Sequence, residues 1–228
     1  MKLLGIVFDM DGVIIDSHPA HRKAWRKFLA TLGKEVSDST LDFILEGRKR
    51  QDILRYFFGE LSDQQLQEYG QKKDRFFEEI GDQVAPISGV IEFLEQVKQL
   101  HMSSALATSA SKRRTRFTLD RLRLSQYFQV VVTGDDVAQG KPHPAAYQTA
   151  AHRLNLPPDK LLAMEDAVSG VKAAKSAGMW CVGVAEGERA SALRSAGAEH
   201  VIPDFVGLSM QGLNQLLTSA APTPLRRD

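Results

Sequence analysis

The sequence has 228 residues, of which 43% are hydrophobic and 25% are charged, a composition typical of an ordinary folded domain. Its 29 Lys and Arg residues nearly balance its 28 Asp and Glu residues, so a net charge of +1 gives no bulk attraction to nucleic acid or to an anionic membrane. No apolar stretch reaches the roughly 18 residues of a membrane span, and the single cysteine, Cys181, cannot form an internal disulfide. We therefore expect a cytoplasmic protein, monomeric by default, without nucleic-acid or membrane partners.

Short apolar runs recur along the chain, and each is typical of a strand that is buried on both faces. The first covers residues 3–8 and ends directly before Asp9. The later runs cover residues 105–107, 130–132, 161–164, 181–184 and 200–202. Helical patterns lie between most of them, including one that starts near Ile87 with Ser88 as N-cap and one that ends at Gly178. This alternation predicts an α/β fold with a doubly wound, Rossmann-like parallel sheet.

One long segment, residues 17–84, interrupts this alternation with helical patterns and no convincing strand. The helices expected there cover residues 20–32, 38–45, 51–58 and 62–80, and each ends at or near a glycine. We predict an α-helical bundle inserted after the first strand, so that a cap domain of residues 17–84 interrupts a core domain of residues 1–16 and 85–228. The tail from residue 220 is expected to fray.

Polar side chains follow four of the predicted strands at the point where each strand ends. In chain order they are Asp9 and Asp11, then Thr108 and Ser109, then Lys141, and finally Glu165 and Asp166. Each group alone has an ordinary explanation, such as a turn, a solvated lysine or a helix start. Ligands collect at the carboxyl ends of parallel strands, however, so we expect all of these groups to converge.

Four converging carboxylates repel one another unless a hard divalent cation joins them, and Mg²⁺ prefers such oxygen ligands. The cation would also neutralise a phosphate and let an anionic nucleophile approach phosphorus. Lys141, a hydroxyl and backbone N–H groups such as that of Ala110 would bind the remaining phosphate oxygens. The set therefore predicts Mg²⁺-dependent phosphoryl transfer.

These strings resemble the motifs of the haloacid dehalogenase-like superfamily, specifically its phosphatase and phosphomutase branch with a helical cap. The string from Asp9 to Val13, Asp-Met-Asp-Gly-Val, matches the first motif, and Ser109 matches the second with Thr108 as a close rival. Lys141 in Gly-Lys-Pro-His-Pro matches the third motif. The string Met-Glu-Asp-Ala-Val-Ser-Gly, which contains Glu165 and Asp166, matches the fourth. The resemblance covers nearly the whole chain.

The resemblance implies a two-step mechanism. Asp9 would attack the substrate phosphorus and form an aspartyl-phosphate. Asp11 would protonate the leaving oxygen and then deprotonate the incoming water or hydroxyl. Mg²⁺ would be held by Asp9, the backbone carbonyl of Asp11 and Asp166, with Glu165 as a direct or water-mediated ligand. The groups expected to hold the transferring phosphoryl group are Ser109, Ala110 and Lys141.

Residues of the cap are expected to set substrate specificity. The string from Gly47 to Arg50, Gly-Arg-Lys-Arg, is either a solvated basic turn or a site for the polar or anionic end of the substrate. Arg50 best matches an arginine that contacts substrate in sugar-phosphate relatives. His21 and Trp25 resemble a cap pattern of the β-phosphoglucomutase group, in which we expect the histidine to touch the site and the tryptophan to pack. The predicted substrate-binding cap residues are thus His21, Gly47 and Arg50, and either Lys72 or Lys73 could face the cleft.

Three functions remain open at this point. We favour a Mg²⁺-dependent phosphatase that hydrolyses a small phosphorylated metabolite of the sugar- or polyol-phosphate class. The alternative is a phosphomutase of the β-phosphoglucomutase type, which His21 and Arg50 favour because a bisphosphate intermediate needs a second phosphate site. Ile15 argues against the mutase, since the resembling pattern has a hydroxyl in this hinge region. A phosphometabolite-binding module without catalysis is the remote alternative, and the intact motifs argue against it.

Overall fold

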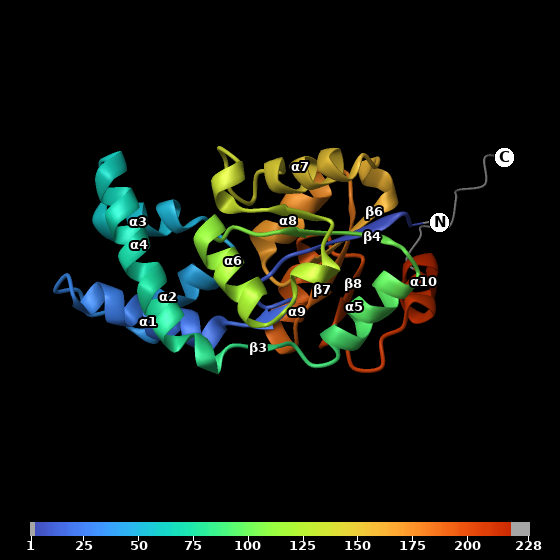
Figure 1. The fold of residues 1–228 in the computed structure, drawn as a ribbon, viewed down its shortest axis with the longest axis horizontal. Helices are drawn as coiled ribbons and strands as arrows, with labels where there is room; N and C mark the ends of the chain where they lie inside the picture. Colours follow the sequence, from blue (N-terminus) through green and yellow to red (C-terminus); the bar gives the residue numbers. More distant parts are fainter. Residues whose placement is uncertain (1–2, 220–228) are drawn as a thin grey trace.

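The computed structural model describes residues 3–219, so the tail from residue 220, which was expected to fray, lies outside the described residues. Two parts are visible in Figure 1, a layered α/β core on one side and a group of helices on the other. Within the described range, no helix combines the length and the apolar character needed to cross a membrane.

In the described residues, the core contains a sheet of six parallel strands in the order β5-β4-β1-β6-β7-β8. The strands are β1 (Gly5–Phe8), β4 (Ser103–Ala107), β5 (Val130–Val132), β6 (Leu161–Glu165), β7 (Trp180–Val184) and β8 (His200–Ile202). Every apolar run that was expected to form a strand does so. The strand order reverses at β1, which places the switch point of the sheet at the carboxyl ends of β1, β4 and β6.

Helices cover both faces of this sheet (Figure 1). One face packs against α5 (Val90–Gln99), α6 (Lys112–Arg121) and α10 (Met210–Ser219), and the other against α7 (Ala145–Leu154), α8 (Val168–Ser176) and α9 (Gly187–Ser195). Side chains of β1 alternate between the two layers, because Ile6 and Phe8 join one apolar cluster and Val7 joins the other. The α/β class and the doubly wound sheet expected from the sequence are therefore confirmed.

The start of α5 differs from the expectation of a helix capped by Ser88. The helix begins at Val90, and its N-cap is Gly89 with a φ of 75°. A Cβ at Gly89 would collide with the backbone of Phe205, so only glycine fits this left-handed position.

The inserted segment folds as a helical bundle between residues 18 and 80, which we call the cap. Its helices are α1 (His18–Ala30), α2 (Asp38–Asp42), α3 (Arg50–Phe58) and α4 (Asp63–Ile80), with the short 3₁₀ turn η1 (Phe43–Leu45) after α2. A separate apolar cluster around Trp25, Phe28 and Leu54 holds these helices together. A capping box of Ser62 and Gln65 fixes the start of α4.

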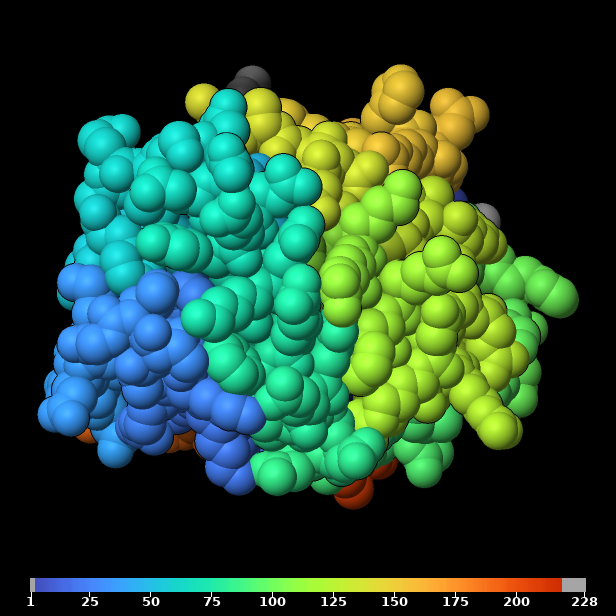
Figure 2. Space-filling view, turned by 60° about the vertical axis from the view of Figure 1, so that its left-hand side comes forward, coloured from blue at the N-terminus to red at the C-terminus, as the bar shows by residue number. Residues whose placement is uncertain are grey.

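Two short antiparallel strands, β2 (Ile15–Asp16) and β3 (Ala85–Pro86), connect the cap to the core. They lie at both junctions of the division into residues 17–84 and residues 1–16 plus 85–228, and that division stays a prediction. Figure 2 shows the cap, coloured blue to teal, lying directly against the green segments of the core.

Candidate active site

Three buried carboxylates meet at the switch point of the sheet. Asp9 follows β1, Glu165 ends β6 and Asp166 comes next in the chain. Because β1 and β6 pair in parallel with Phe8 opposite Met164, the residues that follow lie side by side. One oxygen from each of the three carboxylates lies within 4.8 Å of the others.

Lys141, on the loop between β5 and α7, bridges two of these carboxylates. Its Nζ donates hydrogen bonds to Asp9 Oδ1 at 2.6 Å and to Glu165 Oε1 at 2.5 Å. The hydroxyl of Tyr147 donates to the same Glu165 oxygen at 2.7 Å. Burial alone would lower the pKa of Lys141, but Asp9 and Glu165 together raise it above its usual range. The ammonium group is therefore charged at neutral pH.

The carboxylate cluster fits a divalent cation on the chemistry of its donors. Glu165 is fixed from behind, because its Oε2 accepts the backbone N–H groups of Asp166 at 3.0 Å and Ala167 at 3.1 Å. Asp166 Oδ2 accepts a hydrogen bond from Arg189 at 2.6 Å and lies 3.0 Å from Nε2 of His18. Three buried carboxylates with converging oxygens are the hard ligands that Mg²⁺ takes. The expected ligands Asp9, Glu165 and Asp166 thus lie together, whereas the Asp11 side chain lies outside the cluster.

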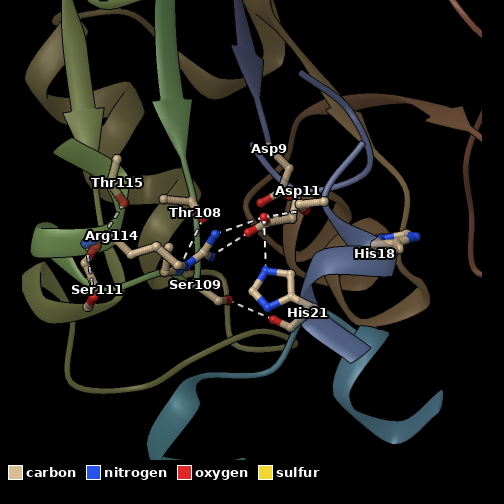
Figure 3. Close-up of polar contacts among 12 residues, drawn as sticks. Asp9, Asp11, His18, His21, Thr108, Ser109, Ser111, Arg114 and Thr115 are labelled. Carbon is tan, nitrogen blue, oxygen red and sulfur yellow. Dashed lines mark hydrogen bonds and ion pairs between the residues drawn. The ribbon is translucent and has the colours of Figure 1, made fainter. Parts of the chain in front are cut away.

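Asp11 instead lies in a network of donors, drawn in Figure 3. Its Oδ1 accepts hydrogen bonds from Ser17 Oγ at 2.6 Å and from Arg114 Nη1 at 2.9 Å, and its Oδ2 accepts from Arg114 Nη2 at 2.5 Å. Burial alone would raise the pKa of Asp11, but Arg114 and His21 lower it well below its usual range. In this arrangement Asp11 is ionised and has no proton to donate.

His21 links Asp11 to the cap. Its Nε2 lies 3.2 Å from Asp11 Oδ1, and its Nδ1 lies 3.2 Å from Nζ of Lys73. Burial, reinforced by the charges of Lys73 and Arg114, lowers the pKa of His21 to about 3. The neutral ring accepts from Lys73 at Nδ1, so its single proton is on Nε2 and faces Asp11. Burial also lowers the pKa of Lys73 to about 7.

The basic string after Gly47 sends its side chains in three directions. Arg48 is exposed and pairs with Glu46 at 3.1 Å. Lys49 reaches the core and donates to the carbonyl of Val137 at 2.8 Å, on the loop that leads to Lys141. Arg50 enters the cleft, where it forms an ion pair with the buried Asp74 of α4. Of the two cap lysines left open by the sequence, Lys73 is buried and lines the cleft, whereas Lys72 is exposed.

Gly47 and the loop after β4 meet across the cleft. The hydroxyl of Ser109 donates to the carbonyl of Gly47 at 2.6 Å (Figure 3). The hydroxyl of Thr108 instead accepts the N–H of Ala110 at 3.1 Å, within its own loop. Thr108, Ser109 and Ala110 all line the cleft, and the choice of Ser109 as the second-motif hydroxyl stays a prediction.

The part of the cleft between cap and core that Asp9, Asp11 and Ser109 line is small. Its cavity volume is about 70 Å³, well below the roughly 300–1,000 Å³ of common ligand pockets. Trp25 lines it and also packs in the apolar cluster of the cap, as the sequence predicted. This space alone does not hold a complete sugar phosphate, but a larger hollow of about 920 Å³ shares His18, Arg48 and Asp166 with its lining.

Several residues that belong to the site were not identified from the sequence, namely Ser17, His18, Asp74, Arg114, Tyr147 and Arg189. From the sequence, the apolar Ile15 argues against a mutase, because the resembling pattern has a hydroxyl in this region. In the structure Ser17 places a hydroxyl 2.6 Å from Asp11, and Ile15 is a fully buried strand residue. The apolar character of Ile15 is therefore no evidence against a mutase. The only sequence signal for Arg114 was its place three residues after Ser111, the N-cap of α6.

The fold and the site together define a capped α/β enzyme with a lysine-bridged carboxylate centre at the carboxyl edge of its sheet. The family model described as "Haloacid dehalogenase-like hydrolase" matches residues 6–184, and the chain belongs to this family.

Individual relatives agree with this assignment. The chain is 36% identical over 186 residues to a phosphorylated carbohydrates phosphatase of Thermotoga maritima, covering 76% of this chain and 81% of the relative. It is 31% identical over 219 residues to a β-phosphoglucomutase of Bacillus subtilis, covering 92% and 93%. The crystal structure of a β-phosphoglucomutase from Clostridium difficile matches with a TM-score of 0.83 at 25% identity, covering 96% of this chain and 98% of that one. The family and the enzyme class expected from the motifs, a phosphoric monoester hydrolase with a mutase as the alternative, are confirmed.

Proposed function

We propose that this protein is a Mg²⁺-dependent phosphatase of a small phosphorylated metabolite of the sugar- or polyol-phosphate class, acting through an aspartyl-phosphate on Asp9. The observation that carries the proposal is the buried cluster of Asp9, Glu165 and Asp166, bridged by Lys141 at the floor of the cleft. The similarity to a phosphorylated carbohydrates phosphatase supports the choice of substrate class.

In the first step an oxygen of Asp9 forms a bond to phosphorus while the bond from phosphorus to the ester oxygen breaks. Lys141 orients Asp9, and together with the hydroxyl of Ser109 it binds the phosphoryl oxygens. Asp11, once it has left Arg114 and taken up a proton from solvent, gives that proton to the leaving alcohol. In the second step Asp11 takes a proton from water, whose oxygen attacks phosphorus and frees Asp9, so that the products are the alcohol and inorganic phosphate.

The metal site of this mechanism would consist of Asp9, Glu165 and Asp166, with the backbone carbonyl of Asp11 as a further ligand. Bound Mg²⁺ supplies charge neutralisation, which lets an anionic nucleophile approach an anionic phosphate. Asp11 has to exchange its present partner, Arg114, before it can carry a proton to the leaving oxygen.

A phosphomutase is the second candidate, and a specific observation favours it. The cap places two cations in the cleft, Arg50 and Lys73, which would hold the second phosphate of a bisphosphate intermediate. We favour hydrolysis because the phosphatase relative is 36% identical and the mutase relative 31%. A module that only binds phosphometabolites is the remote alternative.

The test measures phosphate release from p-nitrophenyl phosphate and from several dozen phosphorylated metabolites. Activity should vanish in excess chelator and return with Mg²⁺, and Asp9→Asn should abolish both turnover and an acid-labile phosphoenzyme. Asp159→Asn, at an exposed site, is the matched control and should change neither. Full activity in excess chelator, or a phosphoenzyme on another residue, would overturn the mechanism.

Two further measurements separate the alternatives. Asp11→Ala should lose turnover and retain Mg²⁺ binding, because only its backbone carbonyl is assigned to the metal. β-Glucose 1-phosphate with a trace of the 1,6-bisphosphate should yield mainly free phosphate or no reaction. Rapid formation of glucose 6-phosphate would establish the mutase instead, and Mg²⁺ binding without turnover of any ester would establish the binding module.

A further inference from the structure

Arg114 is a buried cation whose orientation is fixed on two sides. Its side chain is 6% exposed. Its guanidinium carbon, Cζ, lies over the ring of Phe77 in the cap, 5.1 Å from the ring centroid. The two terminal nitrogens point at Asp11 and hold both of its carboxylate oxygens (Figure 3). The fork of Arg114 is thus aimed at the place where the general acid of the proposed mechanism lies.

The cations near the phosphoryl site are paired with carboxylates, and Arg50 and Lys73 share Asp74. Lys141 pairs with Asp9 and Glu165, and Arg50 pairs with Asp74. Among the ion pairs of residues 3–219, the partner of Arg114 is Asp11. Asp11 therefore both compensates a buried charge and has to serve the reacting oxygens.

Asp11 cannot pair with Arg114 and contact the leaving oxygen of the substrate at the same time. When Asp11 turns to the leaving oxygen, the bidentate pair breaks and the buried guanidinium loses its hydrogen-bonded counter-charge, which leaves the charges of Asp74 and Asp9 without a direct ion pair to Arg114. Breaking a buried pair by removing one partner is strongly unfavourable, because the remaining charge is neither hydrated nor paired. An anionic group of matching shape that reaches Arg114 removes this penalty, and carboxylate and phosphate both match the guanidinium fork.

We propose that Arg114 is a substrate-binding residue that takes up a second anionic group of the substrate in exchange for Asp11. The inference rests on the proposed phosphatase function and narrows its substrate class to phosphorylated metabolites that carry a carboxylate or a second phosphate. Substrates of this kind release Asp11 for catalysis, whereas an ester of a neutral alcohol leaves Arg114 unpaired whenever Asp11 acts.

The place of Arg114 in the cleft agrees with this role. It lines the same cavity as Ser109 and Ala110, on the helix that follows the phosphate-binding loop. Lys73 lies in the same cavity, so an incoming anion meets more than one positive group. The neighbouring Arg113 has a different surrounding: it is 53% exposed and forms a bidentate pair with Glu78 of the cap.

The experiment compares matched substrates with and without the second anion. One arm uses 2-hydroxyethyl phosphate against 2-phosphoglycolate, and the other uses fructose 1-phosphate against fructose 1,6-bisphosphate, with p-nitrophenyl phosphate as a common reference. The wild-type kcat/KM should be at least about tenfold higher for the anionic member of one pair, because a bidentate charged contact contributes at least that much. The arm in which the preference appears identifies a carboxylate or a phosphate as the group that is recognised.

Variants at two adjacent arginines then show which residue causes the preference for the anionic substrate. Arg114→Gln should reduce the ratio of kcat/KM values to near one, mainly through a higher KM for the anionic member. Arg114→Lys should keep part of the preference. Arg113→Gln, which removes the same charge from the same helix, should leave every ratio unchanged.

A wild-type ratio near one in both arms, or a preference that survives Arg114→Gln, overturns the inference while hydrolysis itself confirms the proposed function. Absence of turnover of every ester, with Mg²⁺ present, refutes the proposed function instead. Calorimetric binding of the same substrate pairs still decides the role of Arg114 in that case, since only the anionic members should lose affinity in Arg114→Gln. If circular dichroism shows that Arg114→Gln does not fold, Arg114→Lys and the wild-type ratio provide the decision.

Discussion

Replacing Lys141 by methionine tests the charge balance at the floor of the cleft. Methionine fills a similar volume without the ammonium group, so Asp9 and Glu165 lose the donor that lies 2.6 Å and 2.5 Å from their oxygens. Breaking one buried ion pair by removing a partner costs about 3–5 kcal/mol. In chelator we therefore expect the free energy of unfolding to fall by about 3–5 kcal/mol. For a chain of this length that is a decrease in Tm of about 6–20 °C.

Thermal unfolding in chelator, followed by a titration with Mg²⁺, measures this effect. A ligand that binds only the folded state raises Tm by mass action. Mg²⁺ should raise the Tm of Lys141→Met more than that of the wild type, because the cation compensates the carboxylates that the variant leaves unpaired. Lys175→Met is the control, since Lys175 pairs with Glu199 at a site where the lysine is 34% exposed. Such a pair contributes at most about 1 kcal/mol.

One result would refute this reasoning. If Lys141→Met in chelator unfolds within about 1 kcal/mol of the wild type, the carboxylates do not depend on the lysine for compensation. Asp9 would then have no need of a charged partner, and its proposed orientation by Lys141 would lose its physical basis.

Two further predictions concern His21 and Gly170. The pKa of His21 is about 3 in the folded protein against an ordinary value of 6.5, so between these values the unfolded chain binds the extra proton and stability falls as the pH drops below 6.5. The difference in unfolding free energy between wild type and His21→Asn should therefore change by about 1.4 kcal/mol per pH unit between about pH 6 and pH 4. Denaturant unfolding at a series of pH values measures this difference. If the two proteins lose stability in parallel as the pH falls, the prediction is wrong. A Cβ at Gly170 would overlap the Glu165 carboxylate, so Gly170→Ala should displace Glu165 and reduce Mg²⁺ affinity and turnover by about 100-fold. Gly212→Ala on α10, where a Cβ would have only Ser209 Oγ nearby at 3.4 Å, should leave both unchanged.

Most of the core could be predicted from the sequence because its strands are buried on both faces. Such strands are continuous apolar runs, and the polar residue that follows each run marks the carboxyl edge of the sheet. The positions of Asp9 and Glu165 followed from this rule alone. The order of the strands did not, since nothing in a run of apolar residues says that β1 lies between β4 and β6.

The walls of the cleft were harder to predict because they depend on helix rotation. Adjacent helical residues point about 100° apart, so Arg113 faces Glu78 at the surface while Arg114 faces Asp11 inside. The two are identical in the sequence, and only the N-cap at Ser111 fixes which one turns inward. The same ambiguity left Lys72 and Lys73 undecided. Gly170 belongs to the fourth-motif string, but the sequence does not show its role, which is to leave room for the Glu165 carboxylate.

On the proposed function, an anion that binds in the cleft has to exchange partners with the existing ion pairs. The pairs are Lys141 with Asp9 and Glu165, Arg114 with Asp11, Arg50 with Asp74, and Arg189 with Asp166. A phosphate ester can pair with one of these cations only after the carboxylate of that cation has moved away. The binding free energy of each such contact is therefore the difference between the new ion pair and the one that it replaces. Arg50 is subject to the same rule, and the anion-binding role predicted for it requires Asp74 to be compensated by other donors. Ser111, whose hydroxyl donates to Asp74 at 2.7 Å, is already in place for this. Arg114 differs because, in the proposed mechanism, its partner Asp11 has to move away in every catalytic cycle. A second anionic group of the substrate should therefore gain more binding free energy at Arg114 than at the other cations.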